Sequence, residues 1–408
     1  MIHVLVADAL PESSRTAIAE LGCSVHFEPG ATADDLPALL RETGASVLVV
    51  RSTKVTATAI ESATRLELVI RAGAGVNTID LDAASAHAVR VANCPGTNAA
   101  AVAELAIGLL IALDRRIPDN VVDLRAGRWD KKGYSRARGL AGRTLGVVGT
   151  GSIGRAVIRR AQALGMHVVA WSRSLDDRRA AELGVVRKAD VVDLARDSDA
   201  VSVHVAAAAE TRGLLDAAFF DALPEGALFI NTARAEVVDD SAMRAAVRDR
   251  GLRVALDVFA GEPAGGSGEV DTALFSDPGI YGTHHIGAST EQAQQAVAEA
   301  TVERVRAFVE GTPVPSLVNM DDASERVPAG HTVATLEIRH RNRVGVLAHA
   351  LTELERAGIN VRSMHNALFN GDEGALATIQ VEPVPDGAVT DAVTRSHEDI
   401  LAVRVTAS

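Results

Sequence analysis

The stretch Leu145-Gly-Val-Val-Gly-Thr-Gly-Ser-Ile-Gly154 decides the fold of this chain. A short apolar strand leads into a Gly-x-Gly-x-x-Gly motif, residues 155–164 favour a helix, and residues 167–171 favour a second strand. This order is typical of a dinucleotide-binding unit. The glycines permit a tight turn and a close approach of a pyrophosphate, and the helix N-terminus supplies N–H groups for the anion. We therefore expect Gly149, Gly151 and Gly154 to bind a dinucleotide.

Composition restricts the remaining possibilities. The chain has 408 residues, 47% of them hydrophobic and 23% charged, which is usual for a globular protein of two or three domains. A net charge of −12 without a basic stripe argues against a nucleic-acid partner. The longest apolar run, residues 99–113, contains Glu104 and is too short to span a bilayer, so we expect no membrane association. With only two cysteines and no export signal at the start, we expect a cytoplasmic protein.

The motif lies late in the chain, which indicates a domain before it. Residues 1–97 alternate between strand-like and helix-like stretches, as in a parallel sheet with crossover helices. The expected strands are residues 4–7, 46–50, 66–70 and 90–92, and the expected helices are residues 11–21, 33–42 and 56–63. A second domain, residues 98–285, contains the motif and further strands at residues 200–204, 227–231 and 252–257. A long helix, residues 290–310, would return to the first domain, which then consists of residues 1–97 and 286–318.

The C-terminal residues predict a third domain. Residues 311–330 carry three prolines, and we assign residues 319–330 as a linker. Residues 331–408 then read strand, helix, strand, strand, helix, strand, a βαββαβ order typical of a ferredoxin-like sandwich. The predicted fold class is therefore α/β, with two Rossmann-like, doubly wound parallel-sheet domains and a C-terminal βαββαβ domain.

Three polar residues follow strands after the motif and suggest chemistry. Arg234, Glu262 and His285 would stand at the carboxyl ends of strands, where open α/β sheets bind ligands. An arginine can hold a carboxylate, and a histidine held by a carboxylate can accept the proton of a hydroxyl group. Alternatives stay open at this point: Arg234 as a surface ion pair, Glu262 as a solvated loop residue, or His284 as the proton acceptor. Asp257 could simply end a strand.

Longer motifs resemble the D-isomer-specific 2-hydroxyacid dehydrogenases, and among them the phosphoglycerate-oxidising members that end in an ACT regulatory domain. The resemblance covers nearly the whole chain. It rests on Val50-Arg-Ser-Thr-Lys-Val-Thr56, Arg71-Ala-Gly-Ala-Gly-Val-Asn-Thr-Ile-Asp80, Asn93-Cys-Pro-Gly-Thr-Asn98 with Glu104, Asp257-Val-Phe-Ala-Gly-Glu-Pro263 and His285-Ile-Gly-Ala-Ser-Thr290. It implies that the first domain binds the substrate.

The resemblance also implies roles for individual residues. It makes Arg234, Glu262 and His285 the catalytic residues, and it selects His285 over His284. It places Arg51, Ser52, Gly73 and Gly75 near the substrate acid. Along the coenzyme it places Ser152, Ile153, Thr232, Ala233, Asp257, Gly287 and Ala288. No metal site is expected.

The end of the second nucleotide-binding strand departs from the family. NAD-dependent members place an acid there, which accepts hydrogen bonds from the ribose 2′-OH and repels a 2′-phosphate. Here the position holds Ser172, followed by Arg173. This pair removes the repulsion and offers a cation, so we expect tolerance of NADP beside NAD. In the alternative reading, Arg173 points into solvent and NAD binds without the acid.

For the C-terminal domain the resemblance implies an effector site. His340, Asn342 and Asn360 match positions that bind serine in serine-sensitive relatives, and asparagine amides suit a free amino acid. The alternative is a domain that only supports oligomerisation, without a ligand.

Taken together, the resemblance implies a homo-oligomer, a dimer or tetramer, that oxidises D-3-phosphoglycerate to 3-phosphohydroxypyruvate with NAD or NADP. This is the entry step of L-serine biosynthesis, with L-serine as a possible effector. One alternative is an NADPH-preferring reductase of hydroxypyruvate, glyoxylate or another 2-keto acid. Another is a non-catalytic amino-acid sensor that keeps the nucleotide fold as a scaffold.

Overall fold

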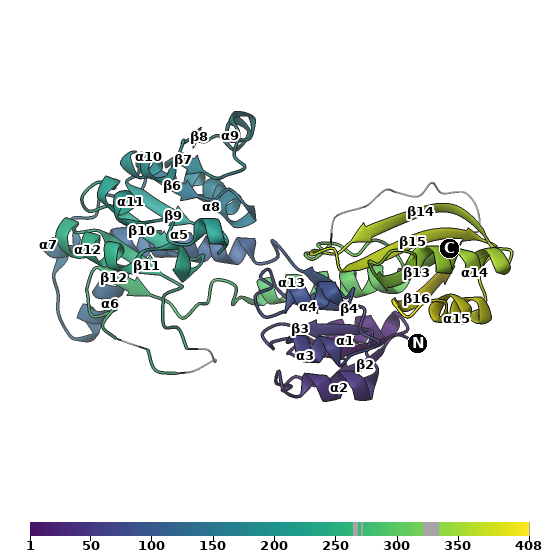
Figure 1. Cartoon of the computed structure of the whole chain (residues 1–408). Coiled ribbons are helices and arrows are strands. Elements are labelled where there is room, and N and C mark those ends of the chain that lie inside the picture. Colours follow the sequence, from purple (N-terminus) through teal and green to yellow (C-terminus); the bar gives the residue numbers. More distant parts are fainter. Residues whose placement is uncertain (264–267, 271, 321–333, 408) are drawn as a thin grey trace. The chain divides into compact units, whose positions relative to one another are not determined.

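The computed structural model describes residues 1–263, 268–270, 272–320 and 334–407 (Figure 1). The chain divides into two compact units. The first combines Met1–Thr97 with Gln295–Ser408, and the second is Asn98–Gln294. The glycine motif belongs to the second unit, whereas the first contains the N-terminal and the C-terminal sheets.

The N-terminal sheet of the first unit is parallel, with strand order β2-β1-β3-β4-β5. Its strands are β1 His3–Val6, β2 Ser24–Phe27, β3 Val47–Val50, β4 Leu68–Arg71 and β5 Arg90–Asn93. Its helices are α1 Glu12–Glu20, α2 Leu36–Thr43, α3 Ala57–Glu61, α4 Leu81–Ala86 and, after the second unit, α13 Glu291–Glu310. Every residue of β3 is buried, because helices cover both faces of a parallel sheet. Phe308 and Val305 of α13 pack in the same core as Val4 and Val6, so the long helix does return to this sheet.

The segment after α13 runs along β5. The N–H of Val318 donates to the Val91 oxygen at 2.9 Å. The buried side chain of Asn319 accepts from the Val91 N–H at 2.8 Å and donates to the Val89 oxygen at 2.9 Å. The first residue of the expected linker is therefore held against the sheet, while residues 321–330 lie outside the described residues.

The C-terminal domain of the first unit is an antiparallel sheet with strand order β14-β15-β13-β16. Its elements are β13 Ala334–Arg341, α14 Val346–Arg356, β14 Asn360–Leu368, β15 Gly374–Glu382, α15 Gly387–Arg395 and β16 Ile400–Ala407. The domain also contacts the N-terminal sheet. The buried Arg339 guanidinium donates to the Leu66 oxygen at 2.7 Å and to the His87 oxygen at 3.2 Å, and Arg90 pairs with Glu337 at 3.2 Å. The domain is therefore docked on its neighbour within this unit, whereas the prolines of residues 311–330 suggested a simple connector.

The second unit is a seven-stranded parallel sheet with order β12-β11-β10-β9-β6-β7-β8. Its strands are β6 Thr144–Val148, β7 His167–Trp171, β8 Val186–Arg187, β9 Ala200–Val203, β10 Leu228–Asn231, β11 Arg253–Leu256 and β12 Ile280–Gly282. Its helices are α5 Ala99–Arg115, α6 Ile117–Arg125, α7 Lys131–Tyr134, α8 Ser152–Ala163, α9 Asp177–Leu183, α10 Val191–Arg196, α11 Ala217–Ala222 and α12 Asp240–Arg250, with short 3-10 turns η1 Ala209–Thr211 and η2 Ala235–Val237.

Two apolar layers cover the faces of this sheet. Helices α5 and α8 pack on one face, and α10, α11 and α12 on the other (Figure 1). Strand order reverses between β6 and β9, so the crevice beyond their carboxyl ends is the position at which such sheets bind dinucleotides.

The predicted fold class is confirmed. The predicted C-terminal βαββαβ order is also present. The strands missed by the sequence analysis are short and lie at or near sheet edges: β2, β8 and β12. Among the described residues, none of the helices combines the length and the apolar character required to cross a membrane.

Candidate active site

The three glycines of the motif each have a different structural reason. Gly149 has a φ of +98°, and a Cβ there would lie 2.5 Å from the His204 carbonyl oxygen at the end of β9. A Cβ on Gly154 would lie 1.9 Å from the Gly149 oxygen. Around Gly151, at the N-terminus of α8, a Cβ would meet no atom within 4 Å. Gly149 and Gly154 thus serve close packing, whereas Gly151 leaves open space where an anion could approach the helix. Ser152 is exposed and Ile153 half-buried beside it.

The ends of β9 and β10 carry polar atoms suited to a ligand. The Thr232 hydroxyl is buried and has no hydrogen-bond partner among the described residues, and the same holds for His204 Nδ1. Ala233 is buried, and its N–H donates to Asn231 Oδ1 at 2.9 Å. Buried polar groups in proteins are nearly always paired, so the orphaned atoms at this edge fit a bound coenzyme.

At the end of β7, Ser172 is half-buried and Arg173 is exposed. The Arg173 guanidinium pairs with the Glu210 carboxylate at 3.6 Å, and both side chains are about two-thirds exposed, at 65% and 63%. Arg173 also lines an open surface cavity together with Asp176, Asp177 and Arg187. Arg173 therefore has an acidic partner from η1, and the sequence analysis missed this acid because it is far away in the chain.

His285 and Glu262 form a pair. His285 Nδ1 lies 2.7 Å from Glu262 Oε2, and the other carboxylate oxygen accepts the Phe259 N–H at 2.7 Å. An ionised carboxylate only accepts hydrogen bonds, so Nδ1 carries the proton and Nε2 keeps a free lone pair. The His285 side chain is 52% exposed, and its backbone adopts a φ of +52°. Within the described residues, His285 contacts a carboxylate and His284 does not.

Asp257 fixes the backbone of the histidine loop. Its buried carboxylate accepts hydrogen bonds from the Thr283 hydroxyl at 2.6 Å, the Ile286 N–H at 2.9 Å and the Gly287 N–H at 2.8 Å. A Cβ on Gly287 would lie 3.0 Å from this carboxylate, so glycine lets the loop approach closely. Ala288 follows, half-buried. Asp257 thereby holds the left-handed backbone of His285 on both sides, a structural role that neither sequence reading included.

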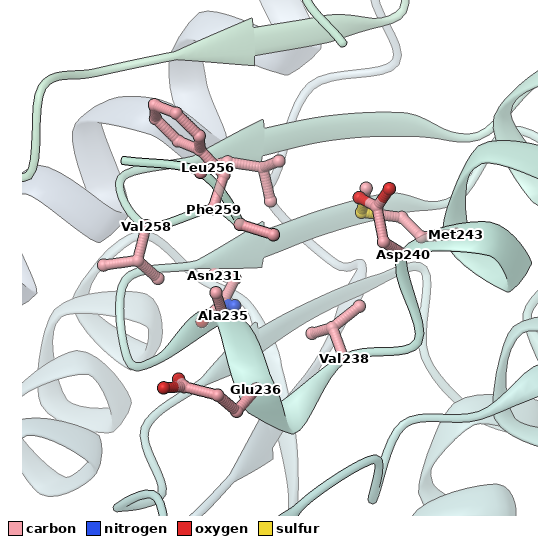
Figure 2. A pocket seen from close by; sticks show the side chains of 11 residues that line it. Asn231, Ala235, Glu236, Val238, Asp240, Met243, Leu256, Val258 and Phe259 are labelled. Carbon is pink, nitrogen blue, oxygen red and sulfur yellow. The ribbon is translucent and has the colours of Figure 1, made fainter. Parts of the chain in front are cut away.

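Arg234 follows β10 and immediately precedes η2. Its backbone oxygen accepts the Asn231 amide at 2.9 Å, while its guanidinium donates to the Ala233 oxygen at 2.6 Å. A cavity of about 320 Å³ lies between η2 and residues 258–261 (Figure 2). It is lined by Asn231, Ala235, Glu236, Val238, Asp240, Met243, Leu256, Val258, Phe259, Ala260 and Gly261.

The expected substrate residues lie in the first unit. Arg51 and Ser52 follow β3, and the Ser52 hydroxyl donates to Asp8 Oδ1 at 2.8 Å. Gly73 is buried with a φ of +156°, and a Cβ there would collide with the Arg71 guanidinium. Gly75 is half-buried on the same loop. Arg71 ends β4, the strand beside β3, so two arginines stand at neighbouring strand ends. Arg71 was not among the expected substrate residues, because in the sequence it is only the first residue of a longer motif.

The three expected effector residues belong to the same C-terminal domain, but they do not lie close together in it. His340 is buried, with Nε2 3.1 Å from Asn366 Oδ1, and Asn342 donates to the Asp372 oxygen at 2.9 Å. Asn360 is exposed at the start of β14, opposite Glu382, whereas His340 is opposite Ala375. Seven residues of extended strand separate these partners, or about 23 Å. A single ligand could reach both ends only if two copies of the domain met.

Comparison with known proteins was consistent across the chain. A sequence profile described as D-isomer specific 2-hydroxyacid dehydrogenase, NAD binding domain, matches residues 107–287. The chain is 35% identical to the D-3-phosphoglycerate dehydrogenase of Mycobacterium leprae over 98% of this chain and 73% of that protein. It is 36% identical to the hydroxypyruvate reductase of Thermotoga maritima over 67% of this chain and 87% of that protein.

The lengths of the relatives differ. The chain spans only 60% of the D-3-phosphoglycerate dehydrogenase of Methanocaldococcus jannaschii, to which it is 35% identical over 78% of its own residues. Among solved structures, the TT0316 protein of Thermus thermophilus superposes with a TM-score of 0.68 at 31% identity, covering 78% of this chain and all of that one.

Proposed function

The chain belongs to the D-isomer-specific 2-hydroxyacid dehydrogenase family, and from this premise we propose that it oxidises D-3-phosphoglycerate to 3-phosphohydroxypyruvate. The observation that carries the proposal is the His285–Glu262 pair, at 2.7 Å, on a loop that Asp257 fixes. An acid/base group held in this way is what removal of a hydroxyl proton requires. A non-catalytic amino-acid sensor would not require an acid/base pair of this kind.

Coenzyme binding is supported by the open space at Gly151 and by the orphaned Thr232 hydroxyl. The N-terminus of α8 would hold the pyrophosphate, and Thr232 and Ala233 would line the remainder of the site. When bound, a nicotinamide coenzyme supplies the acceptor for the hydride that leaves the substrate.

The chain's own residues would bind the acid and move its proton. Arg234 would turn its guanidinium from the Ala233 oxygen to the substrate carboxylate, for which the planar fork is suited. His285 would accept the C2 hydroxyl proton on Nε2, because Nδ1 is committed to Glu262. Glu262 would keep the ring oriented and stabilise it once it carries the second proton.

A panel of D- and L-2-hydroxy acids and 2-keto acids, each assayed with NAD(H) and NADP(H), tests this proposal. We expect the highest kcat/KM with D-3-phosphoglycerate or its keto product. Equal turnover of acids with and without a phosphate would contradict the substrate assignment. Failure of every acid with both coenzymes would contradict the whole proposal.

The second candidate is reduction of hydroxypyruvate or glyoxylate with NADPH. Two observations favour it: the hydroxypyruvate reductase relative, and the end of β7, where Ser172 replaces an acid and Arg173 follows it. The Glu210 carboxylate beside Arg173 weighs against it, because an acid near the ribose would repel a 2′-phosphate. The same panel separates the two candidates.

Serine regulation is the second part of the proposal. A serine molecule would bind where His340 and Asn342 of one C-terminal domain meet Asn360 of a second copy, since one domain holds them about 23 Å apart. A homo-oligomer is therefore required for this site.

Exposed apolar side chains on α6 and the following turn supply a further surface for self-association: Ile117, Val121, Val122, Leu124 and Trp129. The two free, buried cysteines suit a reducing cytoplasm.

A further inference from the structure

Asp8 lies at the carboxyl end of β1, beside the loop that follows β3. The two strands are neighbours in the sheet, and the Ala7 N–H donates to the Val49 oxygen at 3.0 Å. This register brings Asp8 level with Arg51, the first residue of the loop. The Asp8 side chain is half-buried there.

The Asp8 carboxylate accepts hydrogen bonds from the donor groups of the loop Arg51–Thr53. Its Oδ2 atom accepts the N–H groups of Arg51 at 2.7 Å, Ser52 at 3.1 Å and Thr53 at 3.0 Å. Its Oδ1 atom accepts the Ser52 hydroxyl at 2.8 Å. Burial alone would raise the pKa of Asp8, but these hydrogen bonds from Arg51, Thr53 and Ser52 outweigh it and hold the pKa below its usual value of 3.8.

Three successive N–H groups that point to one place form a concave anion-binding nest. In this chain the nest is occupied by a carboxylate of the protein itself, so these backbone groups and the Ser52 hydroxyl are not available to a substrate anion. The Arg51 side chain is then what the loop can offer to a substrate. Its direction depends on a backbone that Asp8 holds by four charge-assisted hydrogen bonds.

We propose that Asp8 is a positioning residue that sets the affinity for the acid substrate by fixing the loop Arg51–Thr53, an inference that rests on the proposed function. The residue needs no contact with substrate. A displacement of about 1 Å in a binding group can reduce catalytic efficiency by about 100-fold, so a loop of this kind requires a rigid support.

The direction in which KM changes when Asp8 loses its charge distinguishes a positioning role from simple electrostatic repulsion. A carboxylate near a binding site for an anion repels that anion, so removing its charge would lower KM if charge alone mattered. Positioning predicts the opposite. Asp8→Asn leaves one acceptor oxygen for three N–H groups and should raise KM for D-3-phosphoglycerate by roughly 10-fold. Asp8→Glu keeps the charge but displaces it by one methylene, and should also raise KM.

The experiment measures kcat, KM and the coenzyme Kd for both variants, together with their melting temperatures. Asp386→Asn is the matched control, because Asp386 also accepts a backbone N–H, from Val389 at 2.9 Å, and its loss changes net charge equally. We expect a raised KM in both Asp8 variants, with coenzyme Kd unchanged and Asp386→Asn like wild type.

Two results would overturn the inference. A KM that is unchanged or lower in folded Asp8→Asn would mean that the carboxylate only stabilises the fold or only repels the substrate. If wild type turns over no acid of the panel, the proposed function fails and the role of Asp8 fails with it. An active wild type with unaffected Asp8 variants would contradict the Asp8 assignment alone.

Discussion

The Nδ1 atom of His285 lies 2.7 Å from Oε2 of Glu262, and this contact is made from a backbone with a φ of +52° at His285. A left-handed conformation is uncommon for a residue with a side chain and tends to occur where the surrounding structure enforces it. Here Asp257 enforces it by accepting the N–H groups of Ile286 and Gly287, at 2.9 and 2.8 Å. The pair is therefore preorganised by the protein before any substrate arrives.

The different environments of two glycines in the motif lead to a first prediction. Gly151→Ala should leave the melting temperature nearly unchanged, because its Cβ would meet no atom within 4 Å. The methyl group would occupy the space at the helix N-terminus and raise the coenzyme Kd by roughly 10- to 100-fold, the value of one hydrogen bond to an anion. Gly154→Ala should instead destabilise the fold by about 1–3 kcal/mol, because its Cβ would lie 1.9 Å from the Gly149 oxygen. Coenzyme titration and thermal melting distinguish the two, and equal stability losses would contradict this account.

Coenzyme choice should depend on Arg173 and Glu210. Arg173→Ala should raise KM for NADPH by roughly 10-fold and leave that for NADH nearly unchanged, since only NADPH carries a 2′-phosphate for the guanidinium. Glu210→Gln should favour NADPH, because it removes the acid that lies 3.6 Å from Arg173. Ser172→Asp should favour NADH by repulsion. If the preference between NADH and NADPH is unchanged in all three variants, these side chains do not reach the ribose.

The half-buried His204 should make stability depend on pH. Burial lowers its pKa from 6.5 to about 3. Between these values the unfolded chain binds a proton that the folded chain does not, so the stabilisation is complete above pH 6.5 and is lost as pH falls. The contribution approaches about 1.4 kcal/mol per pH unit. Urea unfolding across this window should give a shallower pH dependence for His204→Gln than for wild type. Replacement of exposed His167 by Gln is the control, and equal slopes for the two variants would refute the prediction.

Serine should bind the C-terminal domain and lower activity from a distance. The coupling between serine and substrate should be about 1–3 kcal/mol and reciprocal. Asn342→Ala combined with Asn360→Ala should abolish inhibition while leaving uninhibited turnover nearly intact. Calorimetry checks binding directly, and sedimentation shows whether serine changes the oligomer. If millimolar serine gives no heat of binding in active protein, the prediction is contradicted, and the domain serves only docking and assembly.

The sequence predicted the fold well because its signals are local. The glycine motif, the apolar run of β3 and the alternating strands of the C-terminal domain each follow from residues a few positions apart. The docking of the C-terminal domain was not predictable in this way. It depends on the buried Arg339, which donates to the oxygens of Leu66 and His87, more than two hundred residues away in the chain.

In the candidate site, too, local sequence signals were predictive, whereas contacts between residues distant in the chain were not. Residue types and spacing suggested Arg234, Glu262 and His285 with alternatives left open, and the family resemblance chose His285 over His284. The structure adds the contact between His285 and Glu262. The supporting acids were missed. Asp8 and Glu210 act on residues distant in sequence. Asp257 stays a predicted coenzyme-site residue, and its carboxylate also accepts three hydrogen bonds from the histidine loop.

The role of His285 as proton acceptor is best tested by turnover of D-3-phosphoglycerate by wild type, His285→Ala and His284→Ala, measured side by side with saturating coenzyme. We expect His285→Ala to lower kcat by about 10²- to 10⁴-fold, the usual contribution of a positioned acid/base group, with coenzyme Kd unchanged. His284→Ala should lose far less, since His284 does not contact Glu262 in the described part of the chain. Equal losses in the two variants, or a larger loss in His284→Ala, would contradict the assignment of His285 as the proton acceptor.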